Sequence, residues 1–288
     1  MLGFAGGLWW VFDLCTHFQA QYLVFQGLCL LALLAFRRFR WALVAALFLC
    51  VPAWRLAPYY RKPAAETPLR QHLKVLSFNV LSKNTRYADT LRWVQQTDPD
   101  IAFFPEVTPD WLRGLEPLKT RMPYSIAQKR VDNFGCAVFS KYPIVEKSLV
   151  PSEFLEVAMM QVTLEIDGRR VFFVGLHPLP PMSPASARDR NAILTQLARQ
   201  VHDEPLPVIV AGDFNATPWS HGMKPLFDVG LRDTMLGRGF SATWRREIPI
   251  FALPIDHILI GGQIRVAERW TGPDLGSDHR PVVAELRW

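Results

Sequence analysis

Several short apolar runs in this sequence end in side chains that bind metal ions or move protons. These side chains are carboxylates, carboxamides and imidazoles, namely Asn79, Glu106, His177, Asp213, Asn215, Asp256, Asp278 and His279. Side chains at the ends of sheet strands converge on one rim, where open α/β proteins place their chemistry. The sequence therefore predicts a single polar rim built from distant parts of the chain.

Taken singly, each of these residues is explained without a functional role, most simply as part of a turn. An Asn or Asp after a strand is usually a turn former, and His257, inside an apolar run, is better explained as a core group or a group behind the site than as a ligand. The joint occurrence of so many such groups at strand ends favours a functional site.

The residue types at this rim suit phosphoester hydrolysis. Hard oxygen ligands without cysteine favour Mg²⁺ or Mn²⁺ over zinc, and Mg²⁺ needs only one or two carboxylates because it keeps several waters. A metal held among Asn79, Glu106 and Asp278 would polarise a phosphoryl oxygen. His279 beside a carboxylate would be held charged toward the same phosphate, while Asp213 takes a proton from water.

The elements that position these groups are short strands with a few helices between them. Strand-length apolar runs occupy 73–78, 101–104, 136–140, 158–165, 171–176, 207–211, 255–260 and 281–286. Helical spacing of apolar residues occurs over 86–97 and 187–202. Asp167-Gly168 joins two of the strands as a predicted hairpin. The pattern predicts a layered, mixed α/β domain.

A strongly apolar segment precedes this domain. Residues 1–60 contain only Asp13 and four arginines as charged residues, and two uncharged runs cover 21–36 and 41–54. Each run is slightly short for a bilayer span unless its flanking aromatic and arginine side chains lie among the headgroups. We therefore expect two membrane helices, and a third apolar stretch at 2–12 that is short and glycine-rich.

A cleaved signal peptide is the rival interpretation of this segment. It would show a basic start, one apolar region and then a small-residue cleavage site, whereas no basic residue precedes position 37. The expected organisation is a membrane segment at 1–57, a proline-containing linker at 58–72 and a catalytic domain at 73–288. This predicts a multi-pass protein of the cell membrane.

The arginines between the two runs suggest an orientation. Arg37, Arg38 and Arg40 would mark a cytoplasmic turn, which places the catalytic domain on the extracytoplasmic side. Arg55, Arg61 and Lys62 oppose this, because they put comparable charge at the other end of the second helix.

The charge balance excludes an argument for nucleic-acid binding from net charge alone. The chain has a net charge of +6, but residues 70–288 carry 26 basic and 24 acidic residues. A nuclease would have to cluster its basic residues, and the candidate pairs are Lys129-Arg130, Arg188-Arg190 and Arg245-Arg246. The four cysteines are not spaced as a zinc site or a disulfide framework.

Seven motifs in order resemble the endonuclease/exonuclease/phosphatase superfamily, the deoxyribonuclease-I-like metal-dependent phosphohydrolases. They are VLSFNV at 75–80, DPDIAFFPEV at 98–107, GCAVFSKYPI at 135–144, GLHP at 175–178, GDFNATPWS at 212–220, IDHILI at 255–260 and GSDHRPV at 276–282. The resemblance implies a four-layer α/β/β/α sandwich of two mixed sheets and a Mg²⁺-dependent or Mn²⁺-dependent phosphoesterase. With the membrane segment, the sequence looks most like the bacterial membrane-anchored branch of this superfamily.

The resemblance also implies roles for single residues. Asn79 and Glu106 are similar to the first-strand Asn and the metal-binding Glu, and Asp278 resembles a further metal-associated carboxylate. All three are therefore expected at a metal.

The remaining roles concern the phosphate and the water. His177 is similar to the histidine that touches the scissile phosphate, and Asp213 and Asn215 resemble the residues that activate water and brace the phosphate. Asp256 looks like the carboxylate that partners the catalytic histidine, which is His279 here. Because every position holds a suitable residue type, a non-catalytic membrane-tethered binding protein is the disfavoured alternative.

The substrate stays open at this stage between a lipid or small-molecule phosphoester and nucleic acid. Leu81 and His177 stand where abasic-site endonucleases carry an acidic residue and a tyrosine, so the resemblance disfavours DNA repair. The expected partners are a phosphoester substrate and the lipid bilayer, with no obligate protein partner inferred. A lipid-borne or small substrate is slightly favoured, with a non-specific endonuclease or exonuclease as the alternative.

Overall fold

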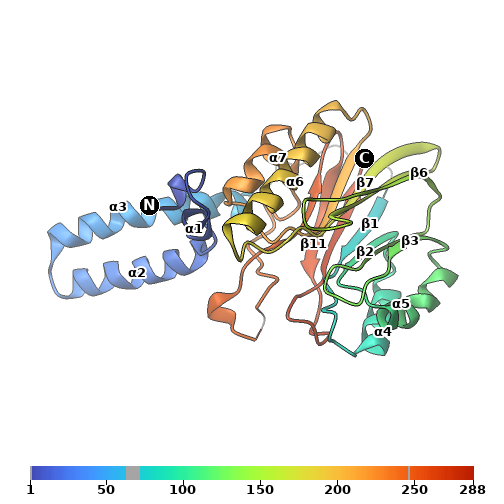
Figure 1. Cartoon of the computed structure of the whole chain (residues 1–288). Coiled ribbons are helices and arrows are strands. Elements are labelled where there is room, and N and C mark those ends of the chain that lie inside the picture. Colours follow the sequence, from blue (N-terminus) through green and yellow to red (C-terminus); the bar gives the residue numbers. More distant parts are fainter. Residues whose placement is uncertain (1, 63–71, 246) are drawn as a thin grey trace.

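The computed structural model describes residues 2–62, 72–245 and 247–288 of the chain, and in them two six-stranded sheets lie face to face (Figure 1). The first sheet has the order β11 (Arg265–Thr271), β12 (Val282–Arg287), β1 (His72–Ser77), β2 (Ile101–Pro105), β4 (Cys136–Ser140) and β3 (Tyr124–Gln128). The second has the order β5 (Ile144–Val150), β6 (Met159–Ile166), β7 (Arg169–Leu176), β8 (Val208–Asp213), β10 (Asp256–Ile260) and β9 (Arg232–Asp233). Both sheets mix parallel and antiparallel pairs, as expected.

The two sheets are held together by an apolar layer between their inner faces. Val75 and Phe103 of the first sheet and Phe173 and Ile209 of the second are fully buried in one cluster. Phe103 lies so close to Gly175 of β7 that a Cβ there would meet its ring at 2.4 Å. A larger residue at that position would force the sheets apart.

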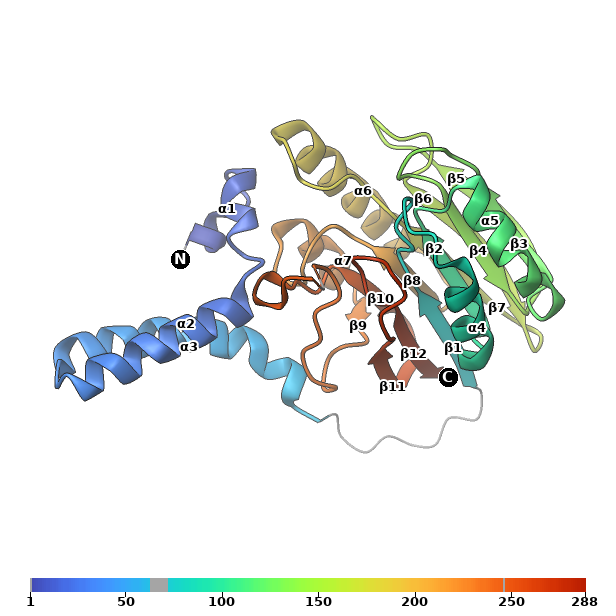
Figure 2. The same cartoon turned by 90° about the horizontal axis from the view of Figure 1, so that it is seen from below.

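Helices cover the outer face of each sheet. On the first sheet lie α4 (Tyr87–Thr97), α5 (Pro109–Leu115) and the 3₁₀ helix η2 (Glu116–Thr120), and Trp111 and Leu115 are buried against Phe104. On the second lie α6 (Pro184–Asp203), η3 (His221–Met223) and α7 (Lys224–Asp228), with Leu194 and Leu197 buried. Figure 2 shows the two helical layers on opposite sides of the strands. The four-layer α/β/β/α sandwich is confirmed.

Most of the expected elements are present. Each of the eight apolar runs overlaps a strand, and β6 and β7 form the predicted hairpin, with Asp167 and Gly168 both at positive φ in its turn. The apolar pattern did not predict β3, β5, β9, β11 or the short helices α5 and α7. Strands β3 and β5 lie at sheet edges and expose most of their residues, so they lack an apolar signal.

The N-terminal segment forms a helical hairpin that projects away from the sandwich (Figures 1 and 2). It consists of η1 (Leu2–Ala5), α1 (Trp10–Leu14), α2 (Gln19–Ala35) and α3 (Phe39–Tyr60). Among the described residues, α3 is the one helix long and apolar enough to cross a membrane, while α2 has 17 residues. The stretch at 2–12 is too short to span.

Helix α3, the second of the two expected membrane helices, ends later than the sequence predicts. It continues through Pro58 to Tyr60, three residues into the range expected to be linker. Its last turns are held by the domain, because Leu56 and Tyr59 are buried against Met235. The rest of the expected linker, at 63–71, lies outside the described residues.

The directions of the strands place the expected site residues at one edge of the sandwich. Strands β1 and β2 are parallel and so are β7 and β8, so the chain leaves each pair on the same side. Strand β10 is antiparallel to β8, and its first residue Asp256 lies opposite Asp213, the last residue of β8. His279 just precedes β12, which is antiparallel to β1.

Candidate active site

Asn79 connects the two sheets at this rim. It follows β1 and is almost fully buried. Its Nδ2 donates to Glu106 Oε1 at 3.0 Å and to Asp213 Oδ2 at 3.1 Å, so one carboxamide joins a carboxylate of each sheet. Its Oδ1 accepts from the Leu81 backbone N–H at 3.0 Å, which fixes the orientation of the amide.

Glu106 is held in a strained backbone conformation directly after β2. Its φ is +63°, in the left-handed region that non-glycine residues rarely adopt. Strain of this kind concentrates at functional sites. Burial raises the pKa of Glu106 and so does the nearby Asp278 carboxylate, although hydrogen bonds from Asn79 and the Ser82 backbone N–H lower it.

Asp213 lies at the centre of the cluster. Its Oδ2 is 3.7 Å from His279 Nε2 and 3.8 Å from His177 Nε2. Its Oδ1 accepts from the backbone N–H of Asn215 at 2.9 Å. Burial raises the pKa of Asp213, and the opposing effect of His279 is smaller. A carboxylate with a raised pKa is a stronger proton acceptor, as a general base requires.

His279 is paired with Asp256. Its Nδ1 lies 2.9 Å from Asp256 Oδ2, so the other ring nitrogen, Nε2, faces the site. Burial alone would lower its pKa, but the carboxylates of Asp256, Asp213 and Asp278 together raise the pKa of His279 to about 10. The imidazole is therefore charged at neutral pH and can donate to an anionic ligand.

His177 and Asn215 both lie near Asp213, at the second sheet's end of the site. His177 is buried beside the Phe134 ring, and burial lowers its pKa. Its Nδ1 is buried without a hydrogen-bond partner among the described residues. Asn215, at a φ of +49°, donates from Nδ2 to the Pro178 carbonyl oxygen at 3.0 Å.

Asp278 completes the rim from the loop before β12. Trp244 Nε1 donates to its Oδ2 at 3.1 Å, and its Oδ1 lies 3.9 Å from His279 Nε2. That Oδ1 is buried without a hydrogen-bond partner among the described residues. An orphaned carboxylate oxygen near Glu106, whose pKa it raises, fits a cation between the two acids.

The structure thus brings all eight expected site residues to one rim. A second grouping is also geometrically able to hold an ion, because ligand atoms of Asp213, Asp256 and His279 lie within 4.8 Å of one another. In that grouping Asp256 and His279 already bond each other. Glu106 and Asp278 supply the partner-free carboxylate oxygen and the hard oxygen donors that Mg²⁺ prefers, whereas Asn79, whose Nδ2 faces Glu106, would have to turn its amide to offer its own oxygen.

Sequence reasoning missed two groups that support the site, Trp244 and Asp13. Trp244 contacts both Asp278 and the His279 ring, and no motif marks it. His257, expected to be a core group or a group behind the site, is fully buried there. It bonds Asp233 through Nδ1 at 2.7 Å and the Ala216 carbonyl through Nε2 at 2.9 Å, which ties the loop after β8 to β9.

The other missed group comes from the N-terminal segment. Asp13 is buried and forms an ion pair with Arg190 of α6, at 2.9 Å from Nη2 to Oδ2. Arg190 also donates from Nη1 to the carbonyl oxygen of Asn215 at 2.8 Å. Asp13 accepts further hydrogen bonds from the Ser220 hydroxyl and the His221 backbone N–H, both at 2.6 Å.

A histidine beside this ion pair strengthens the connection. His17 Nδ1 lies 2.9 Å from the Thr217 hydroxyl and accepts from the Thr217 backbone N–H at 3.4 Å. Burial, with the nearby Arg190 charge, lowers the pKa of His17 to about 4, so the ring is neutral and free to accept. The N-terminal segment therefore clamps the loop at 215–221 that follows Asp213.

The fold and the rim of polar residues agree with the family that the sequence motifs resemble. The sequence model of the Endonuclease/Exonuclease/phosphatase family matches residues 76–279, and the chain belongs to that family. The family that the sequence motifs predicted is therefore confirmed.

Two curated relatives match part of the chain. The UPF0294 proteins of two Vibrio cholerae serotype O1 strains are 30% identical over 122 residues, which is 42% of this chain and 41% of theirs. The alignment therefore spans about two fifths of the length of these curated relatives.

The solved structures show the fold. Humanized D. rerio TDP2 has a TM-score of 0.63 at 17% identity and covers 75% of this chain and 99% of its own. The endonuclease/exonuclease/phosphatase from Beutenbergia cavernae DSM 12333 has 0.63 at 19%, covering 76% and 72%. The human Nocturnin catalytic domain, with a bound sulfate anion, has 0.60 at 20%, covering 76% and 96%.

The clamp gives a stability prediction. Asp13→Asn leaves the Arg190 guanidinium buried without a counter-charge, which typically costs about 3–5 kcal/mol. We expect a clearly lower thermal unfolding midpoint for the full chain in detergent. Asp89→Asn, which removes a surface partner of Arg86 and Arg92, should leave the midpoint nearly unchanged.

A double variant tests whether the loss of stability comes from the unpaired buried charge of Arg190 or from altered packing. Combining Asp13→Leu with Arg190→Met replaces both charges by apolar groups and should recover part of the lost stability. An unaltered midpoint in Asp13→Asn would contradict the clamp.

Proposed function

We propose that this chain is a membrane-anchored, Mg²⁺-dependent phosphoesterase, with a preference for a lipid-borne or small phosphoester over nucleic acid. The observation that carries the reaction is the buried Asn79–Asp213–His279–Asp256 cluster, which holds a proton acceptor and a charged donor side by side. Mn²⁺ is expected to substitute for Mg²⁺.

In this proposal the chain's own residues bind the phosphate and move one proton. Asp213 accepts the proton of the attacking water, and Asn79 orients that carboxylate by donating to Oδ2. His279, held charged by Asp256, donates from Nε2 to the phosphoryl oxygen that accumulates charge. His177 and Asn215 brace the same phosphate from the second sheet.

The metal in this proposal is held by Asn79, Glu106 and Asp278. When bound, Mg²⁺ neutralises charge on a phosphoryl oxygen. The strained Glu106 backbone and the orphaned Asp278 oxygen support this assignment, because each is costly without a ligand.

We propose a division of the chain into a membrane segment at 1–57 and a catalytic domain at 73–288. The hairpin of α2 and α3 carries exposed apolar residues along its length, among them Phe25, Leu28, Leu31, Leu43 and Leu47. Aromatic side chains are exposed near both ends, with Phe39 and Trp41 at the turn and Trp54 and Tyr60 at the domain. That distribution is typical of helices whose ends lie at membrane interfaces.

The substrate preference follows from a loop that links the hairpin to the site. Trp244 bonds Asp278, and nine residues later the loop returns at Leu253, which pairs with Trp244. Between them, η4 (Pro249–Phe251) exposes Ile250 at 69% and Phe251 at 49%. Gln21 of α2 donates to the Ala252 carbonyl at 3.1 Å, so these apolar residues lie next to the membrane hairpin.

Two of the six basic residues that a nuclease would use are engaged in ion pairs within the protein. Arg130 forms ion pairs with Asp132 and Glu156. Arg190 is buried in the clamp. Arg246 lies outside the described residues. This leaves Lys129, Arg188 and Arg245 among the described candidates for the several phosphate contacts that a non-specific nuclease needs.

The catalytic assignment predicts metal dependence and two inactive variants. The full chain in detergent should hydrolyse bis(p-nitrophenyl) phosphate with Mg²⁺ or Mn²⁺, and EDTA should abolish turnover. Asp213→Asn and His279→Ala should each lower kcat about 10²–10⁴-fold, as the loss of an acid–base group does. Asp203→Asn and His202→Ala, exposed at the end of α6, are the matched controls. Full activity of either site variant would refute its role.

The arginine turn between α2 and α3 predicts the orientation of the membrane segment. With Arg37, Arg38 and Arg40 on the cytoplasmic side, the catalytic domain lies outside. In cells with a permeabilised outer layer, added protease should remove the domain. Protection until the inner membrane is lysed would reverse the orientation, and release of the protein by carbonate would refute the anchor.

The apolar loop predicts a defect that depends on the form of the substrate. Replacing Ile250 and Phe251 together by Asp should lower kcat/KM several-fold for a phosphoester embedded in vesicles, because the loop would no longer enter the interface. Turnover of a soluble aryl phosphodiester should stay unchanged. Val145→Asp, on edge strand β5, is the exposed control.

Two results would contradict this proposal. If the double variant loses the same fraction of kcat/KM on both substrates, the loop supports the active site and does not contact the membrane interface. Faster cleavage of duplex DNA than of the vesicle substrate, falling steeply with salt, would favour the nuclease.

A further inference from the structure

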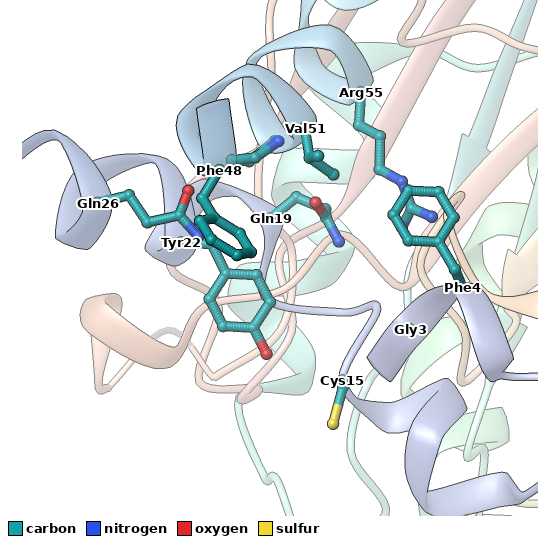
Figure 3. A pocket seen from close by; sticks show the side chains of 10 residues that line it. Gly3, Phe4, Cys15, Gln19, Tyr22, Gln26, Phe48, Val51 and Arg55 are labelled. Atoms are coloured by element: carbon teal, nitrogen blue, oxygen red, sulfur yellow. The ribbon is translucent and has the colours of Figure 1, made fainter. Parts of the chain in front are cut away.

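A cavity lies where the N-terminal helices meet at the base of the hairpin (Figure 3). It has a volume of about 210 Å³. Its walls come from η1, the turn after α1, α2 and α3, and the residues that carry the argument are Phe4, Gln19, Tyr22, Gln26, Phe48 and Arg55. None of these residues belongs to the candidate active site.

Arg55 gives the cavity its charge. Its guanidinium carbon lies 4.5 Å from the centroid of the Phe4 ring, a cation–π distance. Among the described residues, no carboxylate lies within ion-pair distance of Arg55, and Asp13 is paired with Arg190 instead. A half-buried cation without a counter-charge favours an anionic ligand.

The other walls are partly polar and partly apolar. Gln26 Oε1 is buried without a hydrogen-bond partner among the described residues, so a ligand with a donor would satisfy it. Gln19 Nε2 already donates to the Thr16 carbonyl. Phe48 borders the cavity, yet it is 44% exposed on the apolar surface of α3. The cavity is therefore continuous with the surface that faces lipid in the proposed anchor.

We propose that this cavity binds the headgroup of an anionic membrane phospholipid. The phosphate pairs with Arg55, a headgroup hydroxyl donates to Gln26 Oε1, and the acyl chains lie outside along Phe48. A phospholipid accounts for the basic, hydrogen-bonding and apolar walls together, whereas inorganic phosphate leaves the apolar wall without a partner. The proposal rests on the membrane anchor described above.

Binding there would also reach the catalytic loop. The carbonyl oxygen of Arg55 accepts a hydrogen bond from Trp219 Nε1 at 3.3 Å, and the Trp219 ring packs against Tyr59. Trp219 belongs to the same loop as Asn215, which the Asp13 clamp holds. The lipid is thus expected to stabilise the junction between hairpin and domain.

The test uses the full chain purified in mild detergent and titrated with phosphatidylglycerol or phosphatidylcholine, with bound lipid counted by native mass spectrometry. We expect one retained phosphatidylglycerol and at least tenfold weaker retention of phosphatidylcholine. Arg55→Gln should weaken phosphatidylglycerol binding about tenfold or more, the usual effect of losing a hydrogen bond to a charged group. Arg40→Gln, at the other end of α3, should bind like the parent chain.

A second variant guards against misfolding of Arg55→Gln. Val51→Phe fills the cavity without changing any charge and should also abolish the retained lipid. Equal binding by the parent chain and both variants would overturn the proposal, and so would equal binding of the two lipids. Glycerol phosphate competing as well as the intact lipid would assign the cavity to a soluble anion instead.

The same protein, reconstituted into vesicles, shows whether a negative result concerns the lipid-binding cavity or the proposed membrane anchor. Carbonate extraction from vesicles releases the protein only if the anchor is wrong. If the protein stays in the vesicles but shows no lipid selectivity, the proposed lipid site is wrong and the proposed anchor stands.

Discussion

Crowding of negative charge at one rim is the constraint around which this molecule is organised. Glu106, Asp213, Asp256 and Asp278 converge there, and the first three are buried. Burying like charges together is costly, and the structure offsets it with the charged His279 and with the amide of Asn79. A divalent cation, as proposed above, would supply the remaining counter-charge.

The two-sheet architecture makes such crowding possible. Each sheet contributes acids from its own strand ends, and the apolar layer between the sheets fixes their separation. Neither sheet alone holds the set, because Asn79 reaches from the first sheet to Asp213 of the second. The N-terminal segment adds a third support through Asp13 and Arg190, so the loop of Asn215 is fixed from outside the sandwich as well.

Sequence reasoning predicted the buried strands and the rim but not the supports around them. The hairpin at Asp167-Gly168 was predictable because its turn chemistry is local. Strands β3 and β5 were not, because edge strands with exposed residues carry no apolar alternation.

The same holds for the site, because its residues lie in short local motifs whereas its supporting residues are paired with partners far away in the sequence. The eight site residues lie in short motifs, and their types alone indicate hydrolytic chemistry. The role of Asp13 was invisible because its partner Arg190 stands 177 residues away. Trp244 and the loop at 247–252 likewise gain meaning only from what they contact in space. Long-range pairings of single polar residues leave no periodic signal for a sequence to reveal.

The docking of α3 against the domain would set how the proposed membrane-anchored enzyme meets its substrate. Tyr59 packs on Trp219 and Leu56 is buried, so the helix is gripped before the chain reaches residue 63. With α3 anchored in a bilayer, the active site would stand at a fixed height above it and search by lateral diffusion. Its rate would then depend on substrate molecules per unit area of membrane, and diluting a lipid substrate with inert lipid would slow it even at constant bulk concentration.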